Sequence, residues 1–120
     1  MSELSSLDVL KKRVEEYLSK NSPGTLQLFN IYCRQMYRAD CISLLFTSPS
    51  RLYHIVLSHF RGDVTSTDLS FSILFLSPLV LLLSKSEAVR ELLDLAKLGK
   101  DKEFLELVAR LMGEGRLEML

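Results

Sequence analysis

The three prolines of this chain all follow a serine, and the repeated pair divides the sequence into helices. The pairs are Ser22-Pro23, Ser48-Pro49 and Ser77-Pro78. A serine hydroxyl accepts a hydrogen bond from a free amide in the first turn of a helix. Proline suits the first helical position, because the amide hydrogen that it lacks would have no partner there. Each pair therefore predicts that a helix begins at it.

Amphipathic patterns lie between these starting points. The first predicted helix runs from about Ser6 to Lys20, because apolar residues recur there at spacings of three and four. These residues are Leu7, Leu10, Val14 and Tyr17 or Leu18. A second helix is predicted to start at Thr25, with a longer apolar stripe. That stripe consists of Leu26, Phe29, Cys33, Met36 or Tyr37, and Leu44.

Asp40 falls on the apolar stripe of the second helix, where an unpaired carboxylate is costly. One explanation is that the helix breaks near Ala39 and Asp40 caps a new helix. The other is that Asp40 has a partner such as an arginine. We favour the break.

The centre of the chain contains an ambiguous segment. A third helix is predicted from Ser48-Pro49, with Gly62 as its C-terminal cap. Its apolar residues are Leu52, Ile55, Val56 and Phe60. Leu69 to Ile73 then alternates apolar and polar residues, which is typical of a strand. A lone strand has nothing to pair with, so we favour a helix capped near Ser66 or Thr67.

The last part of the sequence predicts one buried helix and two amphipathic ones. Leu79 to Leu83 is apolar all round, which is typical of a helix at the centre of a bundle. The final two helices are expected from Ser86 to Gly99 and from Lys100 to Gly113. Their apolar residues are Val89, Leu92, Leu93 and Ala96, then Phe104, Leu107, Val108 and Leu111. Residues 114–120 are expected to be a frayed tail, in which Leu117 and Leu120 could contact a partner.

These patterns predict an all-α fold: residues 1–120 form a single helical domain of about six helices with a buried, Leu-rich central helix. The length of 120 residues fits one domain, and 48% hydrophobic residues exclude wholesale disorder. The N-terminus lacks the pattern of a secretory signal. The apolar stretch from Leu69 to Leu83 is shorter than the ~20 residues of a membrane span, so we expect no membrane partner.

The residues that carry chemistry elsewhere are sparse here. No phosphate-binding glycine loop or metalloprotease motif is present, and His54 and His59 would lie about 140° apart around a helix. Cys33 and Cys41 are too few for a zinc site, and on a single helix they would be ~12 Å apart, too far for a disulfide. We expect them to be small buried hydrophobes in a cytoplasmic protein. The sequence predicts no catalytic residues, no metal and no cofactor.

The charge is neutral in total but unevenly distributed. Between Tyr17 and Gly62 there are five basic residues and one acidic residue, a local balance of +4. The basic residues are Lys20, Arg34, Arg38, Arg51 and Arg61. From Asp63 onward seven basic residues face ten acidic ones, a balance of −3. Arginine forks suit phosphate groups, so these five residues are candidates for binding a nucleic-acid backbone. The alternatives are that the arginines pair with the acidic C-terminal helices or form a protein interface.

The chain resembles the small helical subunits of CRISPR interference complexes, especially those of archaeal type. The resemblance lies in size, in helical character and in the basic central region around Arg34, Arg38, Arg51 and Arg61. The resemblance implies a non-catalytic subunit present in several copies along a ribonucleoprotein. It implies contact with other protein subunits and with guide RNA or displaced single-stranded DNA through basic surface residues. The alternative is a protein–protein adaptor or a homodimeric helical bundle with no nucleic-acid role. A third reading, a small enzyme or ligand-binding protein, would need His54, His59 or Asp40 to converge on a pocket.

Overall fold

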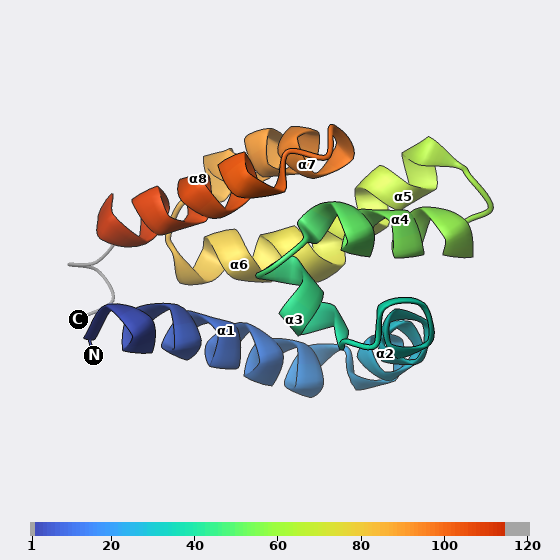
Figure 1. Cartoon of the computed structure of the whole chain (residues 1–120), viewed down its shortest axis with the longest axis horizontal. Helices are drawn as coiled ribbons and strands as arrows, with labels where there is room; N and C mark the ends of the chain where they lie inside the picture. Colours follow the sequence, from blue (N-terminus) through green and yellow to red (C-terminus); the bar gives the residue numbers. More distant parts are fainter. Residues whose placement is uncertain (1, 115–120) are drawn as a thin grey trace.

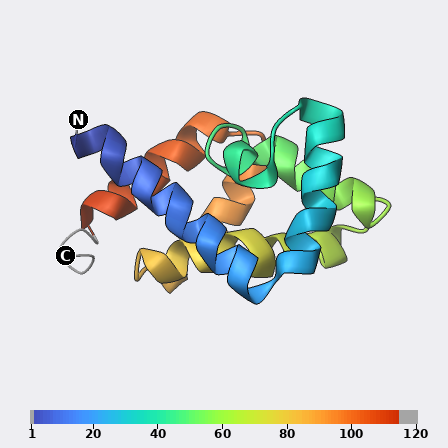
Figure 2. The same cartoon turned by 90° about the horizontal axis from the view of Figure 1, so that it is seen from below.

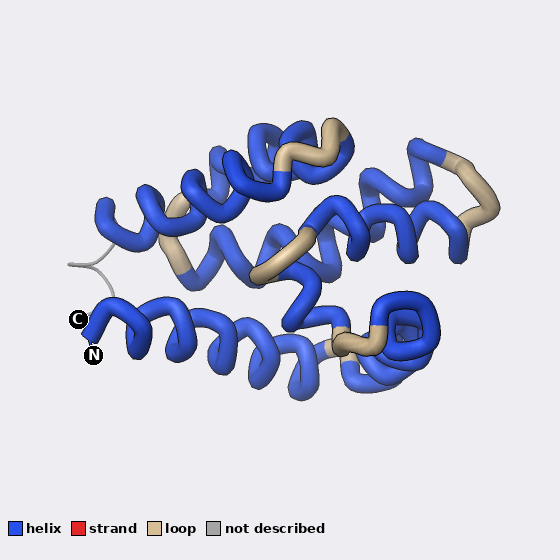
Figure 3. The backbone as a smooth tube through the Cα atoms, in the orientation of Figure 1, coloured by secondary structure: helices blue, strands red, loops and turns tan. Residues whose placement is uncertain are grey.

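The computed structural model describes residues 2–114, and within that range the regular elements are all helical. Figure 1 shows their arrangement and Figure 3 their short connections. In chain order they are α1 Ser2–Asn21, α2 Pro23–Tyr37, α3 Cys41–Leu45, α4 Pro49–His59, α5 Val64–Phe71, the π-helical turn η1 Ser72–Leu76, α6 Ser77–Leu82, the 3₁₀ turn η2 Ser86–Ala88, α7 Val89–Lys97 and α8 Asp101–Glu114.

The helices lie in three layers (Figure 1). α1, α2 and α3 form one outer layer, α4, α5 and α6 the middle, and α7 with α8 the other outer layer. α5, η1 and α6 form one uninterrupted helix, Val64–Leu82, so that the described residues make seven helices in one body. The radius of gyration, 13.5 Å, matches the value of about 13.6 Å expected for one compact domain of this length. The predicted all-α bundle is confirmed.

The first two Ser-Pro pairs begin helices, as predicted. α2 starts at Pro23, two residues before the Thr25 predicted from the apolar stripe, and α4 starts at Pro49. Neither serine hydroxyl caps its own helix, however. The Ser48 hydroxyl instead donates a hydrogen bond of 2.8 Å to the carboxylate of Asp101, at the start of α8. The pair therefore marks the helix start through proline rather than through the serine side chain.

The third pair, Ser77-Pro78, does not begin a helix, and that prediction is wrong. The chain passes through Pro78 without leaving the helix, because the preceding turn widens from α to π. The Ser77 amide donates to the carbonyl of Ser72, five residues back. A proline inside an α-helix removes one hydrogen bond and clashes with the carbonyl four residues earlier. The π turn accommodates both effects and lets the helix continue.

The predicted break near Ala39 is confirmed, and Asp40 caps the new helix. Its carboxylate accepts a hydrogen bond of 2.8 Å from the Ser43 amide. The carboxamide oxygen of Asn30, on α2, accepts another from the Cys41 amide, also at 2.8 Å. α2 itself ends where Arg38 adopts the left-handed conformation, at φ 57°. These contacts fold α3 back against α2.

The segment from Leu69 to Ile73 is helical, as we favoured, and not a strand. The alternating side chains do not share a face: Phe71 is 0% exposed, whereas Leu69 and Ile73 are 61% and 57% exposed. The helix begins earlier than expected, since Asp63 rather than Ser66 or Thr67 occupies the position before its first residue. Thr67 is buried, and its hydroxyl donates to the carbonyl of Asp63.

The core is built from one side of nearly every helix. The buried residues of α1 are Leu10, Val14 and Leu18, whereas Leu7 and Tyr17, also assigned to that stripe, are exposed. Met36 of the second stripe is exposed as well. Leu79 and Val80 of α6 and the following Leu83 are buried, but Leu81 is 56% exposed, so this segment is not covered on all sides.

The two C-terminal helices form where they were predicted. η2 leads into α7, whose buried residues include Leu92, Leu93 and Ala96. α8 begins at Asp101 and buries Phe104, Leu107, Val108 and Leu111. The predicted tail, with Leu117 and Leu120, lies outside the described residues apart from Glu114, which is the last residue of α8.

One helix in the described range, Val64–Leu82, is long and apolar enough to cross a membrane by length and composition alone. Its mean hydropathy is 1.5, and 39% of it is buried inside the protein. Core helices of globular proteins have the same character. Asp68 is the only charged residue in it.

We predict that Phe71→Ala lowers the free energy of unfolding by about 3–5 kcal/mol, because it empties a fully buried aromatic site. Leu69→Ala and Ile73→Ala, on the exposed side of the same helix, should change it by less than about 1 kcal/mol. Urea unfolding followed by circular dichroism measures all three. Equal losses for the three variants would mean that these residues share one buried face.

Candidate nucleic-acid interface

Arg34, Arg38 and Arg51 come together where the end of α2 meets the start of α4. Arg34 is in the last turn of α2, and Arg38 follows that helix directly. Arg51 is in the first turn of α4, with its guanidinium carbon 5.1 Å from the centre of the Tyr37 ring. Arg34 and Tyr37 are three residues apart on α2 and are therefore neighbours on its surface. We call Arg34, Tyr37, Arg38 and Arg51 the arginine corner.

All three arginines of this corner are exposed, and Tyr37 is half-buried between helices. The contact of Arg51 with the tyrosine ring is a cation–π interaction, worth about 0.5–1 kcal/mol at an exposed site. It holds one guanidinium in place without using any of its hydrogen-bond donors. Those donors remain available to an anion from outside the protein.

The other two predicted residues lie elsewhere. Lys20 is at the end of α1, beside a shallow, open groove between α1 and α6. Arg61 follows the C-terminal end of α4, ten residues from Arg51, or about 15 Å along the helix axis. The structure thus gathers three of the five predicted cations and leaves Lys20 and Arg61 apart.

None of these five basic side chains forms an ion pair with a carboxylate in the part of the chain that the structure describes. The alternative that the central arginines pair with the acidic C-terminal helices therefore has no support within residues 7–113, whose side chains are described. Asp40 reduces the positive charge near the corner. Its carboxylate is already engaged in capping α3.

Three aspartates in the acidic region from Asp63 onward, Asp68, Asp94 and Asp101, have partners other than the five predicted basic residues. Asp101 accepts hydrogen bonds from the hydroxyls of Ser48 and Ser50 and from the Ser50 amide, all between 2.8 and 2.9 Å. It therefore caps the N-terminus of α4 from a different helix, where a negative charge also complements the helix dipole. Asp94 is 3.9 Å from Arg90 on the same helix face.

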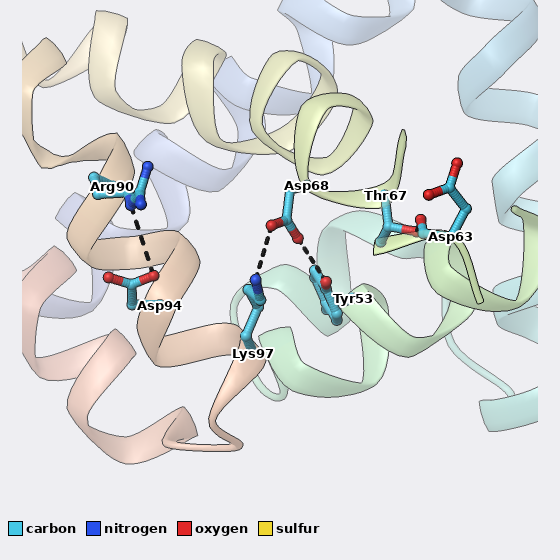
Figure 4. A network of polar contacts seen from close by, with 7 residues as sticks. All are labelled: Tyr53, Asp63, Thr67, Asp68, Arg90, Asp94 and Lys97. Carbon is cyan, nitrogen blue, oxygen red and sulfur yellow. Dashed lines mark hydrogen bonds and ion pairs between the residues drawn. The ribbon is translucent and has the colours of Figure 1, made fainter. Parts of the chain in front are cut away.

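Asp68 is the centre of a network that joins α4, α5 and α7 (Figure 4). The Tyr53 hydroxyl donates to one carboxylate oxygen at 2.6 Å, and the Lys97 ammonium donates to the other at 2.8 Å. Burial opposes ionisation of Asp68, but the hydrogen bonds from Lys97 and Tyr53 outweigh it and hold the pKa of this carboxyl below its usual value. Burial and the Asp68 carboxylate raise the pKa of Tyr53 well above its usual value.

The histidines do not form a site with Asp40. The His54 ring contacts Tyr53, whereas the His59 ring packs against Phe29 and Phe60. Among the described residues, no three side chains of His, Cys, Asp or Glu are grouped closely enough to hold a metal ion.

Sequence reasoning missed two contacts. One is the stacking of Arg51 on Tyr37, which joins α4 to α2. The sequence pattern of neither helix predicts this contact. The other is between the cysteines, which are buried as expected but lie on two helices with their sulfur atoms 2.8 Å apart. The separation of ~12 Å applies only to a continuous helix. The predicted break at Asp40 was the signal that could have revealed this contact.

Comparison of the chain with protein-family models, with curated proteins and with solved structures finds no match.

We predict that Asp68→Asn lowers the free energy of unfolding by about 1–3 kcal/mol at pH 7, because it removes the charge that Lys97 and Tyr53 bind. A carboxyl whose pKa is lowered by folding stabilises the protein above its unfolded pKa, ~3.9. This contribution is lost as the pH falls through the lower, folded value. The difference between wild type and variant should therefore shrink below about pH 4.

The control for this prediction is Asp94→Asn, which removes an exposed carboxylate with a longer ion pair. It should change the stability by less than about 1 kcal/mol at pH 7. Urea unfolding at a series of pH values between 2 and 7 gives both comparisons. A difference for Asp68→Asn that is independent of pH over this range would contradict the assignment.

Proposed function

We propose that this chain is a non-catalytic helical subunit of a larger nucleoprotein assembly, which contacts the phosphate backbone of RNA or single-stranded DNA through the arginine corner. One observation carries the proposal. Arg51 of α4 stacks on Tyr37 at the end of α2, where Arg34 and Arg38 also lie; all three arginines are exposed and have no carboxylate partner among the described residues. The resemblance to small subunits of CRISPR interference complexes supports the same assignment.

The chemistry of the corner favours backbone contacts over base recognition. Each guanidinium offers planar, paired donors that match phosphate oxygens. Half-buried Tyr37 supports Arg51 and presents little free ring surface for stacking on a base. Binding through such contacts is independent of sequence and sensitive to salt, because each neutralised phosphate releases counterions.

We predict that the triple variant Arg34→Ala, Arg38→Ala, Arg51→Ala binds a mixed-sequence single-stranded oligonucleotide roughly 10- to 100-fold more weakly than wild type at 50 mM salt. Three phosphate contacts on a single strand give wild type a slope of about −2 in a plot of log affinity against log salt. The variant should have a slope near zero. Fluorescence anisotropy with a labelled RNA and a labelled DNA measures both quantities.

The matched control removes three exposed cations from other surfaces: Lys12→Ala, Arg13→Ala, Arg110→Ala. It changes the net charge equally, so any loss common to both triple variants reports charge alone. Circular dichroism verifies that both variants remain folded. Equal affinities for wild type and the corner variant at low salt would exclude the nucleic-acid role of these residues.

A second candidate function, a protein adaptor or homodimeric bundle, is favoured by a different surface. Leu69, Ile73, Ser77 and Leu81 follow one another at four-residue intervals on the helix Val64–Leu82, and all four are exposed. We call them the outer strip. Three of these residues are large and apolar and none is charged, which is typical of a protein contact surface.

For this candidate we predict concentration-dependent association that Leu69→Glu with Ile73→Glu abolishes, because two carboxylates would have to be buried on contact. Sedimentation velocity over a hundredfold range of concentration measures the association. Leu98→Glu is the control, because Leu98 is an exposed leucine at the end of α7 and lies outside the strip. A wild-type protein that sediments as a monomer throughout would contradict the homodimer.

A further inference from the structure

We propose that Cys33 and Cys41 are a redox modification site, at which an intramolecular disulfide forms between α2 and α3 by exchange with a small disulfide such as oxidised glutathione. This inference concerns the core of the protein. It does not depend on the proposed nucleic-acid contact, and its test uses a different measurement.

The geometry is the first support. The two sulfur atoms are 2.8 Å apart, between the 2.05 Å length of a disulfide bond and the ~3.5–4.0 Å separation of ordinary non-bonded heavy atoms. Cys33 lies in α2 and Cys41 in α3, and their sulfur atoms meet at the contact between these two helices. A small approach of the two side chains is enough to form the bond.

The surroundings hold the two thiols in this position. Both residues are 0% exposed. The Cys41 amide donates to Asn30 on α2, and the Asp40 cap binds the Ser43 amide in the same turn of α3. The closed loop contains only the end of α2, the connection and the first residue of α3. No large rearrangement of the backbone is therefore needed.

Burial also determines how the reaction begins. The hydrogen bond between Cys41 and Cys33, together with burial, raises the pKa of the Cys41 thiol, so the folded state holds Cys41 as an unreactive thiol. Attack on a disulfide requires a thiolate. The exchange must therefore pass through a local opening that exposes one cysteine. α3 spans just five residues, and its separation from α2 would expose the two sulfur atoms.

The exchange is balanced in atoms and electrons. One protein thiolate attacks a sulfur of oxidised glutathione, forms a mixed disulfide and releases a glutathione thiolate. The second protein thiolate then attacks the protein sulfur of that mixed disulfide and releases the other glutathione. The protein sulfurs lose two electrons to glutathione, and the two protons of the protein thiols end on the two glutathione thiols.

The test compares the reduced protein with protein incubated with oxidised glutathione until its mass no longer changes. We expect the intact mass to fall by two hydrogen atoms, with no bound glutathione and no thiol free for alkylation after denaturation. The disulfide restricts the unfolded chain, so the melting temperature should rise by about 10 °C. Reduction with dithiothreitol should reverse both changes.

Cys33→Ala and Cys41→Ala are the controls, since each leaves a single thiol. Neither variant should lose two hydrogen atoms, and any product should be a glutathione adduct or a covalent dimer. Because either variant could be less stable, the wild-type mass result stands as an independent measurement. Wild-type protein that still has two alkylatable thiols, or that carries glutathione, at the end of the incubation would overturn the proposal. A second sample excludes slow exchange in the folded protein: it is unfolded in urea with oxidised glutathione and then refolded. Its mass and its number of alkylatable thiols must equal those of the protein that was incubated in the folded state.

Discussion

The burial of α4 is the constraint on which the rest of the structure depends. This helix contacts α2, α3, α5, α7 and α8, and its residues Leu52, Ile55 and Val56 are almost fully buried. A helix surrounded in this way must have its free amides satisfied by its neighbours. Asp101 does so from the start of α8, which links the packing of the C-terminal helices to the first turn of α4. The two halves of the chain are thereby joined by polar contacts as well as by apolar packing.

The same arrangement decides where charge can lie. One face of α4 is buried, its only arginine, Arg51, lies in the first turn on the exposed face, and the next arginine in the chain, Arg61, follows the end of the helix. α2 ends beside that first turn, which brings Arg34 and Arg38 close to Arg51 through their common neighbour Tyr37. The neutral total charge of the sequence conceals this local concentration of basic groups. It also conceals that Asp68, Asp94 and Asp101 bind partners other than the central arginines.

Much of the fold could be predicted, because helix boundaries depend on local chemistry. Asp40 was recognisable as a cap, and Pro23 and Pro49 as helix starts, from their immediate neighbours. Pro78 was misassigned because a proline at a helix start and one behind a π turn have the same local sequence. The candidate site was less predictable. Five cations were identified by type and position, but which of them gather depends on the angle between α2 and α4, which neither helix encodes alone. Figure 2 shows that α2 runs across the direction of α1.

The π turn at Ser72–Leu76 has a consequence for the register of the longest helix in the middle layer. A π turn holds one residue more than an α turn, so it rotates everything after it by about 100° around the helix axis. The first part of this helix contacts α4 and the last part contacts α1, and the rotation lets one rod match two differently placed neighbours. If the same residues were wound as an α turn, Leu79, Val80 and Leu83 would rotate by about 100° away from the places where they now pack. The π winding of this single turn is therefore as necessary to the packing of the middle layer as the apolar character of its residues.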